Sequence, residues 1–403
     1  MLKNLTLVSL LNFLVAALMG LTLRFAYVLP IDINYRFLTH GHSHVAMLGW
    51  AYLMLFTFII HYFIPHPRKV YKNLFWVTEL SVIGMMISFP LQGYAAFSIS
   101  FSTLHIFCSY FFVYLLWKDL GNKSFFSTKL LKTALIFMLI STIGVWCLGP
   151  AMVFSGPASA LYQIAIQFFL HFQFNGWFMI AVIALFIKQF EKKGLVINNN
   201  LFYVFYKLLV LATVCTLALP VSWFIKHPAF QWLNSFGVLI QLLALWYFIK
   251  LLQPVLRRFR IQTNTVTIHA YRFALACFII KILLQSASLF PEVGILSFQI
   301  KNFVIGFIHL SMLGVITGFL FAFISQTSLI QRSQNWFGFG FYLFLYGFIG
   351  TEIILFIQGI LFYLGIGLIP SYYDILFVLS GFLPAGIICI IVSVIKNKLH
   401  PRF

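Results

Sequence analysis

Charged side chains are scarce in this chain, and acidic ones are the scarcest. Only 8% of the 403 residues are charged, whereas about a quarter are charged in an ordinary soluble domain. Hydrophobic residues make up 62% of the sequence, and only seven residues are acidic, which disfavours carboxylate metal sites. The composition excludes a soluble globular protein and predicts an all-α protein that crosses a membrane many times.

Cysteine is also rare, and its placement excludes two kinds of structure. None of the five cysteines has C-x-x-C spacing, and all fall inside apolar runs, where they are expected to pack as apolar residues. The sequence therefore argues against a disulfide framework and against a thiolate metal site. A small-residue cleavage site is missing from the N-terminal apolar run too, so we read that run as a retained first span.

Long apolar runs are what the chain has in abundance. A spanning helix needs about 20 apolar residues, and twelve segments meet this rule, near residues 5–29, 38–64, 73–90, 95–117, 130–152, 159–188, 201–225, 229–252, 266–290, 299–325, 336–363 and 372–396. The third is the shortest and ends at Pro90. Connections are too short to fold alone, so residues 1–403 are expected to form a single integral domain in contact with lipid.

The distribution of basic residues predicts the orientation of these spans. The net charge of +19 would suggest nucleic-acid binding in a soluble protein, but in a membrane protein it is read loop by loop, and no nucleic-acid partner is expected. With the N-terminus inside, the outer segments hold only Arg24, Arg36, Lys226 and Lys301 of the 26 basic residues. The pattern predicts cytoplasmic termini and a multi-pass protein of the cytoplasmic (inner) membrane.

Histidines at the start of the second span are the first functional signal. His40, His42 and His44 stand at alternate positions, at the mouth of an apolar run. Imidazole in hydrocarbon is costly unless it binds a metal or forms a hydrogen bond. His44, together with His105, His171 and His309 on spans 4, 6 and 10, is expected at a similar depth in the outer half of the membrane. Four such histidines could converge on a buried metal or haem.

Three of these histidines share a local pattern. His44, His171 and His309 are each followed five residues later by glycine, which lets another helix or a flat macrocycle approach the backbone. For His105 a packing or pathway role is the alternative. For His171 the alternative is a polar substrate cavity, because Gln167, Gln173 and Asn175 surround it in the sequence.

Other ionisable residues within the spans also suggest chemistry. Lys281 and Glu352 are central and are candidates for a proton path, whereas Glu79, read as close to a cytoplasmic end, suggests local pairing. Arg24 and Arg36 flank the outer loop beside the histidines. They are positioned for haem propionates or, equally, for lipid headgroups.

The twelve spans and the histidines of spans 2, 6 and 10 resemble the catalytic subunit of the haem-copper oxidase superfamily, which includes nitric oxide reductases. Gly306–Gly314 is similar to span 10 of its cbb-type branch, with Phe307 in place of the high-spin haem histidine. The resemblance implies a low-spin haem between His44 and His309 and a copper role for His171.

The resemblance has two departures and a rival. Phe307 is the first departure, and the second is span 7, which lacks the pair of histidines that the family uses for copper. The length of the chain and its His42-Ser43-His44 motif are also similar to the NnrS family of haem- and copper-containing proteins associated with nitric oxide stress.

The expected function is therefore a haem-binding, or haem- and copper-binding, membrane protein in respiratory electron transfer or in the reduction of nitric oxide or oxygen. His105, His171 and His42 would serve a second metal or the substrate pocket. The alternatives are a proton-coupled small-molecule transporter without a cofactor, and a haem carrier or nitric oxide stress protein without turnover. The sequence does not identify the electron donor or a partner subunit.

Overall fold

The computed structural model is all-helical, and it describes residues 1–121, 125–327, 329 and 335–397. Within these residues, twelve segments are long and apolar enough to cross a membrane, which confirms the predicted fold class of a polytopic helical membrane protein. Lys123, Arg332, Lys398 and Arg402, which belong to the loop-charge pattern, lie outside the described residues. The side of the membrane on which the termini lie stays a prediction.

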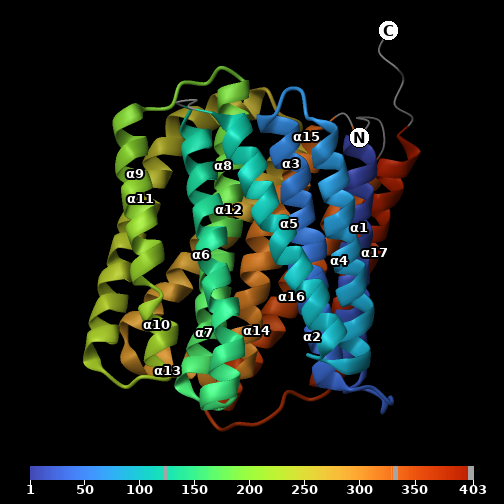
Figure 1. Ribbon diagram of the computed structural model, residues 1–403, viewed down its shortest axis with the longest axis vertical. Coiled ribbons are helices and arrows are strands. Elements are labelled where there is room, and N and C mark those ends of the chain that lie inside the picture. Colours follow the sequence, from blue (N-terminus) through green and yellow to red (C-terminus); the bar gives the residue numbers. More distant parts are fainter. Residues whose placement is uncertain (122–124, 328, 330–334, 398–403) are drawn as a thin grey trace. The chain divides into compact units, whose positions relative to one another are not determined.

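Eight of the twelve spans are built mainly from one helix each, and they lie close to the predicted segments. They are α1 (Leu2–Phe25), α4 (Lys69–Gln92), α5 (Ala96–Leu120), α6 (Phe126–Ser155), α11 (Pro228–Ile261), α12 (Thr265–Ser286), α16 (Trp336–Tyr363) and α17 (Tyr372–Lys396) (Figure 1). Span 7 joins α9 (Asn199–Cys215) to the short α10 (Ala218–Ser222), and α13 (Pro291–Gln299) precedes span 10.

Spans 2, 6 and 10, which carry His44, His171 and His309, are built differently, because a π-helical segment interrupts each α-helix. Span 2 consists of α2 (Tyr35–His44), the π-helical Val45–Tyr52 and α3 (Leu53–Phe63). Span 6 consists of α7 (Ala160–His171), the π-helical Phe172–Phe178 and α8 (Met179–Lys192). Span 10 consists of α14 (Lys301–His309), the π-helical Leu310–Ile316 and α15 (Thr317–Gln326).

Spans 2, 6 and 10 are also the most buried. Their most apolar windows are 78%, 83% and 78% buried, whereas the corresponding windows of the other nine spans are 33% to 50% buried. Many large apolar side chains on the other nine spans are exposed, as expected for residues that meet lipid. The spans that carry His44, His171 and His309 are therefore the ones most enclosed by protein.

The third span is longer than the sequence suggested. α4 has 24 residues, and Pro90 lies in its last turn instead of ending it; the helix stops at Gly93, which has a φ of 64°. Glycine tolerates this positive φ without the clash that a Cβ would cause. Because α4 begins at Lys69, Glu79 lies near the middle of the span, and the expected position close to its cytoplasmic end is wrong.

Contacts divide the chain into two compact units, which are described separately. Unit 1 comprises Met1–Gly121, Thr265–Tyr271 and Thr317–Phe403, and unit 2 comprises Asn122–Asn264 and Arg272–Ile316. The expectation of a single domain stays a prediction.

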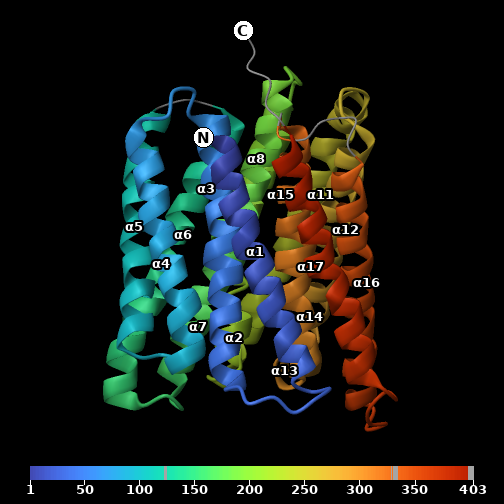
Figure 2. The same cartoon turned by 90° about the vertical axis from the view of Figure 1, so that its right-hand side faces the viewer.

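In unit 1 the first and last helices pack side by side. Figure 2 shows α1 next to α17, and Lys3 Nζ donates to Ile395 O (3.0 Å) and Asn397 O (2.8 Å). The start of α1 and the end of α17 therefore lie at the same end of the unit, as an even number of spans requires.

Spans 2 and 10 also meet in unit 1. Trp50 is stacked on Phe13 with ring centroids 4.3 Å apart, and its Nε1 donates to Thr317 Oγ1 over 2.8 Å. A buried tryptophan needs such a partner for its N–H group. In unit 2, the π-helical segments of spans 6 and 10 pack against each other.

Close helix packing in unit 2 yields a test of the fold. A Cβ added to Gly144 of α6 would lie 2.5 Å from Ala165 O and 2.9 Å from Phe169 N, both backbone atoms of α7. We expect Gly144→Ala to destabilise the protein by about 1–3 kcal/mol, since the two backbones must separate. Thermal unfolding of the purified protein measures this loss.

Gly149 of the same helix is the matched control, because a Cβ there meets nothing within 4 Å. Gly149→Ala should leave the unfolding temperature unchanged or raise it slightly. Equal effects of the two substitutions would contradict the packing of α6 on α7.

Candidate functional site

Each of the three His-x4-Gly motifs occupies the same backbone transition. The histidine is the last residue of an α-helix, the next residue begins a π-helical segment, and the glycine lies within that segment, at Gly49, Gly176 and Gly314. π-Helical segments are rare and frequently mark functional sites. The sequence pattern identified the three positions but not the change in helical geometry.

The glycines allow neighbouring helices to approach. A Cβ at Gly49 would lie 2.8 Å from Val82 Cγ1 and 3.0 Å from Asn12 Cβ, and one at Gly176 would lie 2.6 Å from Phe137 Cβ. The sequence suggested that these glycines make room either for another helix or for a flat macrocycle. At Gly49 and Gly176 a neighbouring helix occupies the space.

His44 is held in an orientation that suits a metal ligand. Its Nδ1 is 2.8 Å from His40 O, and its ring is stacked on Phe89 with centroids 4.1 Å apart. The carbonyl accepts only from a protonated nitrogen, so the proton sits on Nδ1 and Nε2 keeps its lone pair. Metal-binding histidines commonly donate their other ring N–H to a backbone carbonyl in this way.

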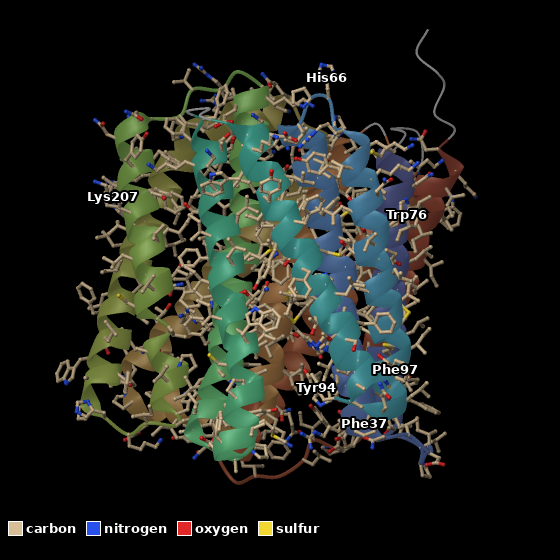
Figure 3. The ribbon with its side chains drawn as sticks, viewed as in Figure 1. Phe37, His66, Trp76, Tyr94, Phe97 and Lys207 are labelled. Atoms are coloured by element: carbon tan, nitrogen blue, oxygen red, sulfur yellow. The ribbon has the colours of Figure 1, made fainter. Side chains whose placement is uncertain are left out.

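His42 and His40 lie beside His44 in the same helix. His42 Nδ1 is 2.8 Å from Ala16 O, and the ring packs so closely on α1 that a Cβ at Gly20 would lie 2.8 Å from His42 Cε1. The ring of His40 meets Tyr94 edge-on at 4.7 Å. Tyr94 lies at the end of unit 1 opposite to His66 (Figure 3). His40 is half-buried there, close to the expected aqueous edge.

His105 on α5 has an unusual environment. It is 4% exposed, its ring meets Tyr52 edge-on at 4.6 Å, and its Nε2 has no hydrogen-bond partner among the described residues. His105 belongs to unit 1 with His44 and lies within electrostatic range of it. A buried polar atom without a partner costs about 1–3 kcal/mol, so this nitrogen is a candidate for contact with a ligand.

His171 in unit 2 is engaged at both ring nitrogens. Nε2 lies 2.7 Å from Thr213 O, and Asn175 Nδ2 lies 3.4 Å from Nδ1. A metal bound to His171 would have to displace one of these partners. Thr213 was not singled out from the sequence, because a backbone carbonyl acceptor leaves no signal in residue type.

Lys281 extends this polar region of unit 2. It is 2% exposed, and its Nζ bonds Gln285 Oε1 (3.2 Å) and lies 5.2 Å from the centroid of the Phe307 ring. Its charge lies within electrostatic range of His171. The Phe307 ring thus lies against an ammonium group.

Arg24 and Glu352, both in unit 1, lie within electrostatic range of each other, and Arg24 is also within range of Tyr35 and Tyr372. Neither of the two roles expected for Arg24 included this proximity to Glu352. Arg36 is exposed, as either role allows.

The predicted site residues divide between the two units. Unit 1 holds His42, His44, His105, Arg24, Arg36 and Glu352, and unit 2 holds His171, His309 and Lys281. The proposed ligand pair His44 and His309 thus draws on both units and stays a prediction. In the described part of the chain, no group of three or more His, Cys, Asp or Glu side chains is placed to hold a metal ion.

The two buried histidines 105 and 171 yield a matched prediction on stability in protein without added cofactor. His105→Phe should be neutral or stabilising, because it removes a buried nitrogen that has no partner. His171→Phe should cost about 1–3 kcal/mol, because the bond to Thr213 O is lost. Thermal unfolding of both variants measures the difference, and a larger loss for His105→Phe would contradict these hydrogen-bond assignments.

Comparisons with known proteins do not assign the chain to a family. No protein-family model matches it, and no curated protein matches its sequence.

Proposed function

We propose that this membrane protein binds haem through His44 and acts in electron transfer or in the reduction of nitric oxide or oxygen. His309 is the second residue that would hold the haem, as predicted from the sequence. Two neutral imidazoles give a low-spin haem suited to electron transfer, and a haem with one histidine keeps an open face for a gas. The cytoplasmic membrane is the proposed location.

The observation that carries this proposal is the hydrogen bond from His44 Nδ1 to His40 O. It fixes the tautomer with an unprotonated Nε2, and the stacked Phe89 ring fixes the plane of the imidazole. Orienting the ligand before the cofactor binds lowers the entropy that binding must offset.

His105 adds an independent reason to expect a ligand in unit 1. Its unpartnered Nε2 lies in an apolar interior, where a metal or a polar group of a substrate would satisfy it. His105 is the candidate for the second metal or the substrate pocket, with His42 as an accessory.

Copper is the weaker part of the proposal. The nitrogens of His171 are both engaged, and the copper histidines of span 7 are absent from the sequence. Copper binding at His171 would require the bond to Thr213 O to break, so the proposal does not depend on it. Lys281 and Glu352 are the proposed proton-path residues, since a reduction that consumes protons needs groups that carry them across the apolar interior.

The direct test is the visible spectrum of the purified protein, recorded reduced minus oxidised together with iron and copper analysis. We expect a low-spin haem signal that is lost in His44→Ala and in His309→Ala. A folded sample without haem, or a spectrum that survives both substitutions, would contradict the proposed ligands. His66→Ala is the control, because His66 is an exposed loop residue.

Catalysis is tested separately from binding. Consumption of nitric oxide or oxygen with an artificial electron donor is expected if the protein is a reductase. Haem binding without consumption would favour a haem carrier or a nitric oxide stress protein without turnover.

A second candidate function rests on the polar region of unit 2. Hydrogen-bonding groups and a buried charge lie around one part of spans 6 and 9, at His171, Asn175, Lys281 and Gln285. A proton-coupled transporter of small molecules requires such groups within its spans. If this function is the correct one, the purified protein will lack iron. Lys281→Met will then abolish proton-coupled uptake in vesicles, whereas Lys250→Met, at an exposed position, will not.

A further inference from the structure

Glu79 is the one acidic residue near the middle of a membrane span in unit 1 that the proposed function does not use. It is 6% exposed and lies about 15 Å along α4 from Lys69. Because the hydrocarbon layer is about 30 Å thick, this position is close to its midplane. Among the described residues, Glu79 takes part in no ion pair. An ionised carboxylate without a cation is costly at this depth.

A groove connects Glu79 with the lipid-facing side of unit 1. It has a volume of about 310 Å³ and is lined by Val8 and Leu11 of α1 and by Trp76, Glu79, Leu80 and Ile83 of α4. The side chains of Leu11 and Leu80 are 50% and 56% exposed. Trp76 projects from the outer side of α4 (Figure 3). Every lining residue other than Glu79 is apolar, so acyl chains of the bilayer are the expected occupants of the groove.

Asn12 determines which oxygen of Glu79 carries a proton. Its Nδ2 donates to Glu79 Oε2 over 2.7 Å and to Gly49 O over 3.2 Å, so both N–H bonds of the amide are in use. Oε2 is therefore an acceptor, and Oε1 is the oxygen that would carry the proton in the acid form. The same amide links Glu79 to the π-helical segment that follows His44.

Among the described residues, no cationic side chain around α4 pairs with Glu79 in place of a proton. The elements packed against it carry these titratable side chains, none of which bonds Glu79 in the described residues: His40, His42, His44, Tyr52, His105 and Cys108. Lys118 and Asp119 lie at the end of α5, and Asp119 pairs with Arg68 there (2.9 Å). Within the described residues, Asn12 is the side chain that bonds Glu79.

We propose that Glu79 is a proton-binding site within the membrane, held as a neutral carboxylic acid and open through the groove to lipid-soluble weak acids and bases. Such a site exchanges a proton with a carrier dissolved in the bilayer, on a route separate from Lys281. It does not depend on haem binding, so it can fail or hold independently of the proposed function.

Lipophilic carbodiimide is the probe that separates a protonated acid in lipid from an ordinary carboxylate. The acid O–H adds across one N=C bond: oxygen bonds to carbon, and the proton moves to nitrogen. Acyl transfer to nitrogen then gives a stable N-acylurea, so the residue gains the mass of the reagent and nothing leaves. Protein in lipid vesicles is treated with dicyclohexylcarbodiimide at neutral pH and analysed by peptide mass spectrometry.

We expect labelling at Glu79 at least tenfold above that at Glu292, an exposed acidic residue of the same protein that serves as internal comparison. Labelling should fall as the pH is raised, because the reaction needs the acid form. Glu79→Gln should lose the label at residue 79. Absence of the label in folded wild-type protein, or equal labelling of Glu79 and Glu292, would overturn the proposal.

A second variant tests the route through the groove. Leu11→Trp adds bulk at a half-exposed, lipid-facing position and should reduce labelling of Glu79 several-fold without unfolding the protein. Leu18→Trp is its matched control, because Leu18 lies on the same helix at 46% exposure but outside the groove. Equal labelling in the two variants would show that the reagent reaches Glu79 by another path and would overturn the role of the groove.

Discussion

Hydrocarbon offers no hydrogen bonds, and this constraint governs the whole structure. Helices satisfy the backbone internally, and buried hydroxyl groups such as those of Thr57, Thr78 and Thr213 each donate to the carbonyl four residues earlier. Against this background a buried polar group that lacks a partner, or a buried acid that lacks a cation, is informative. His105 and Glu79 are two such groups, and each leads to an inference about a ligand or a proton.

The histidine sites share one architectural device. An α-helix ends at His44, His171 or His309, and a π-helical segment that contains a glycine follows. At Gly49 and Gly176 the glycine lies where another helix approaches. The π-helical geometry changes the direction of the side chains that follow each histidine, and the three spans concerned are the most buried of the twelve. The same transition from α-helix to π-helix on three spans suggests an internal repeat. Because these spans are enclosed by protein, their histidines lie in a low-dielectric environment, in which a neutral imidazole can bind a metal.

The three histidines nevertheless differ in what they can do. His44 presents a free lone pair because a backbone carbonyl holds its other nitrogen. His171 is committed to Thr213 and Asn175, and it shares its surroundings with the ammonium of Lys281. Similar sequence motifs thus lead to an imidazole with one hydrogen-bonded nitrogen in unit 1 and an imidazole with two in unit 2. Both the haem proposal and the transport alternative rest on this difference.

The sequence by itself determined the fold class and the spans, because about 20 apolar residues in a row have no other stable arrangement than a membrane helix. It also singled out His44, His171 and His309, because polar residues are conspicuous in apolar runs. Only the tertiary structure decided which nitrogens are engaged, that Arg24 and Glu352 lie within electrostatic range of each other, and that Glu79 is central and bonded to Asn12. Those outcomes depend on carbonyl acceptors and on residues far apart in the chain, and neither leaves a periodic signal in the sequence.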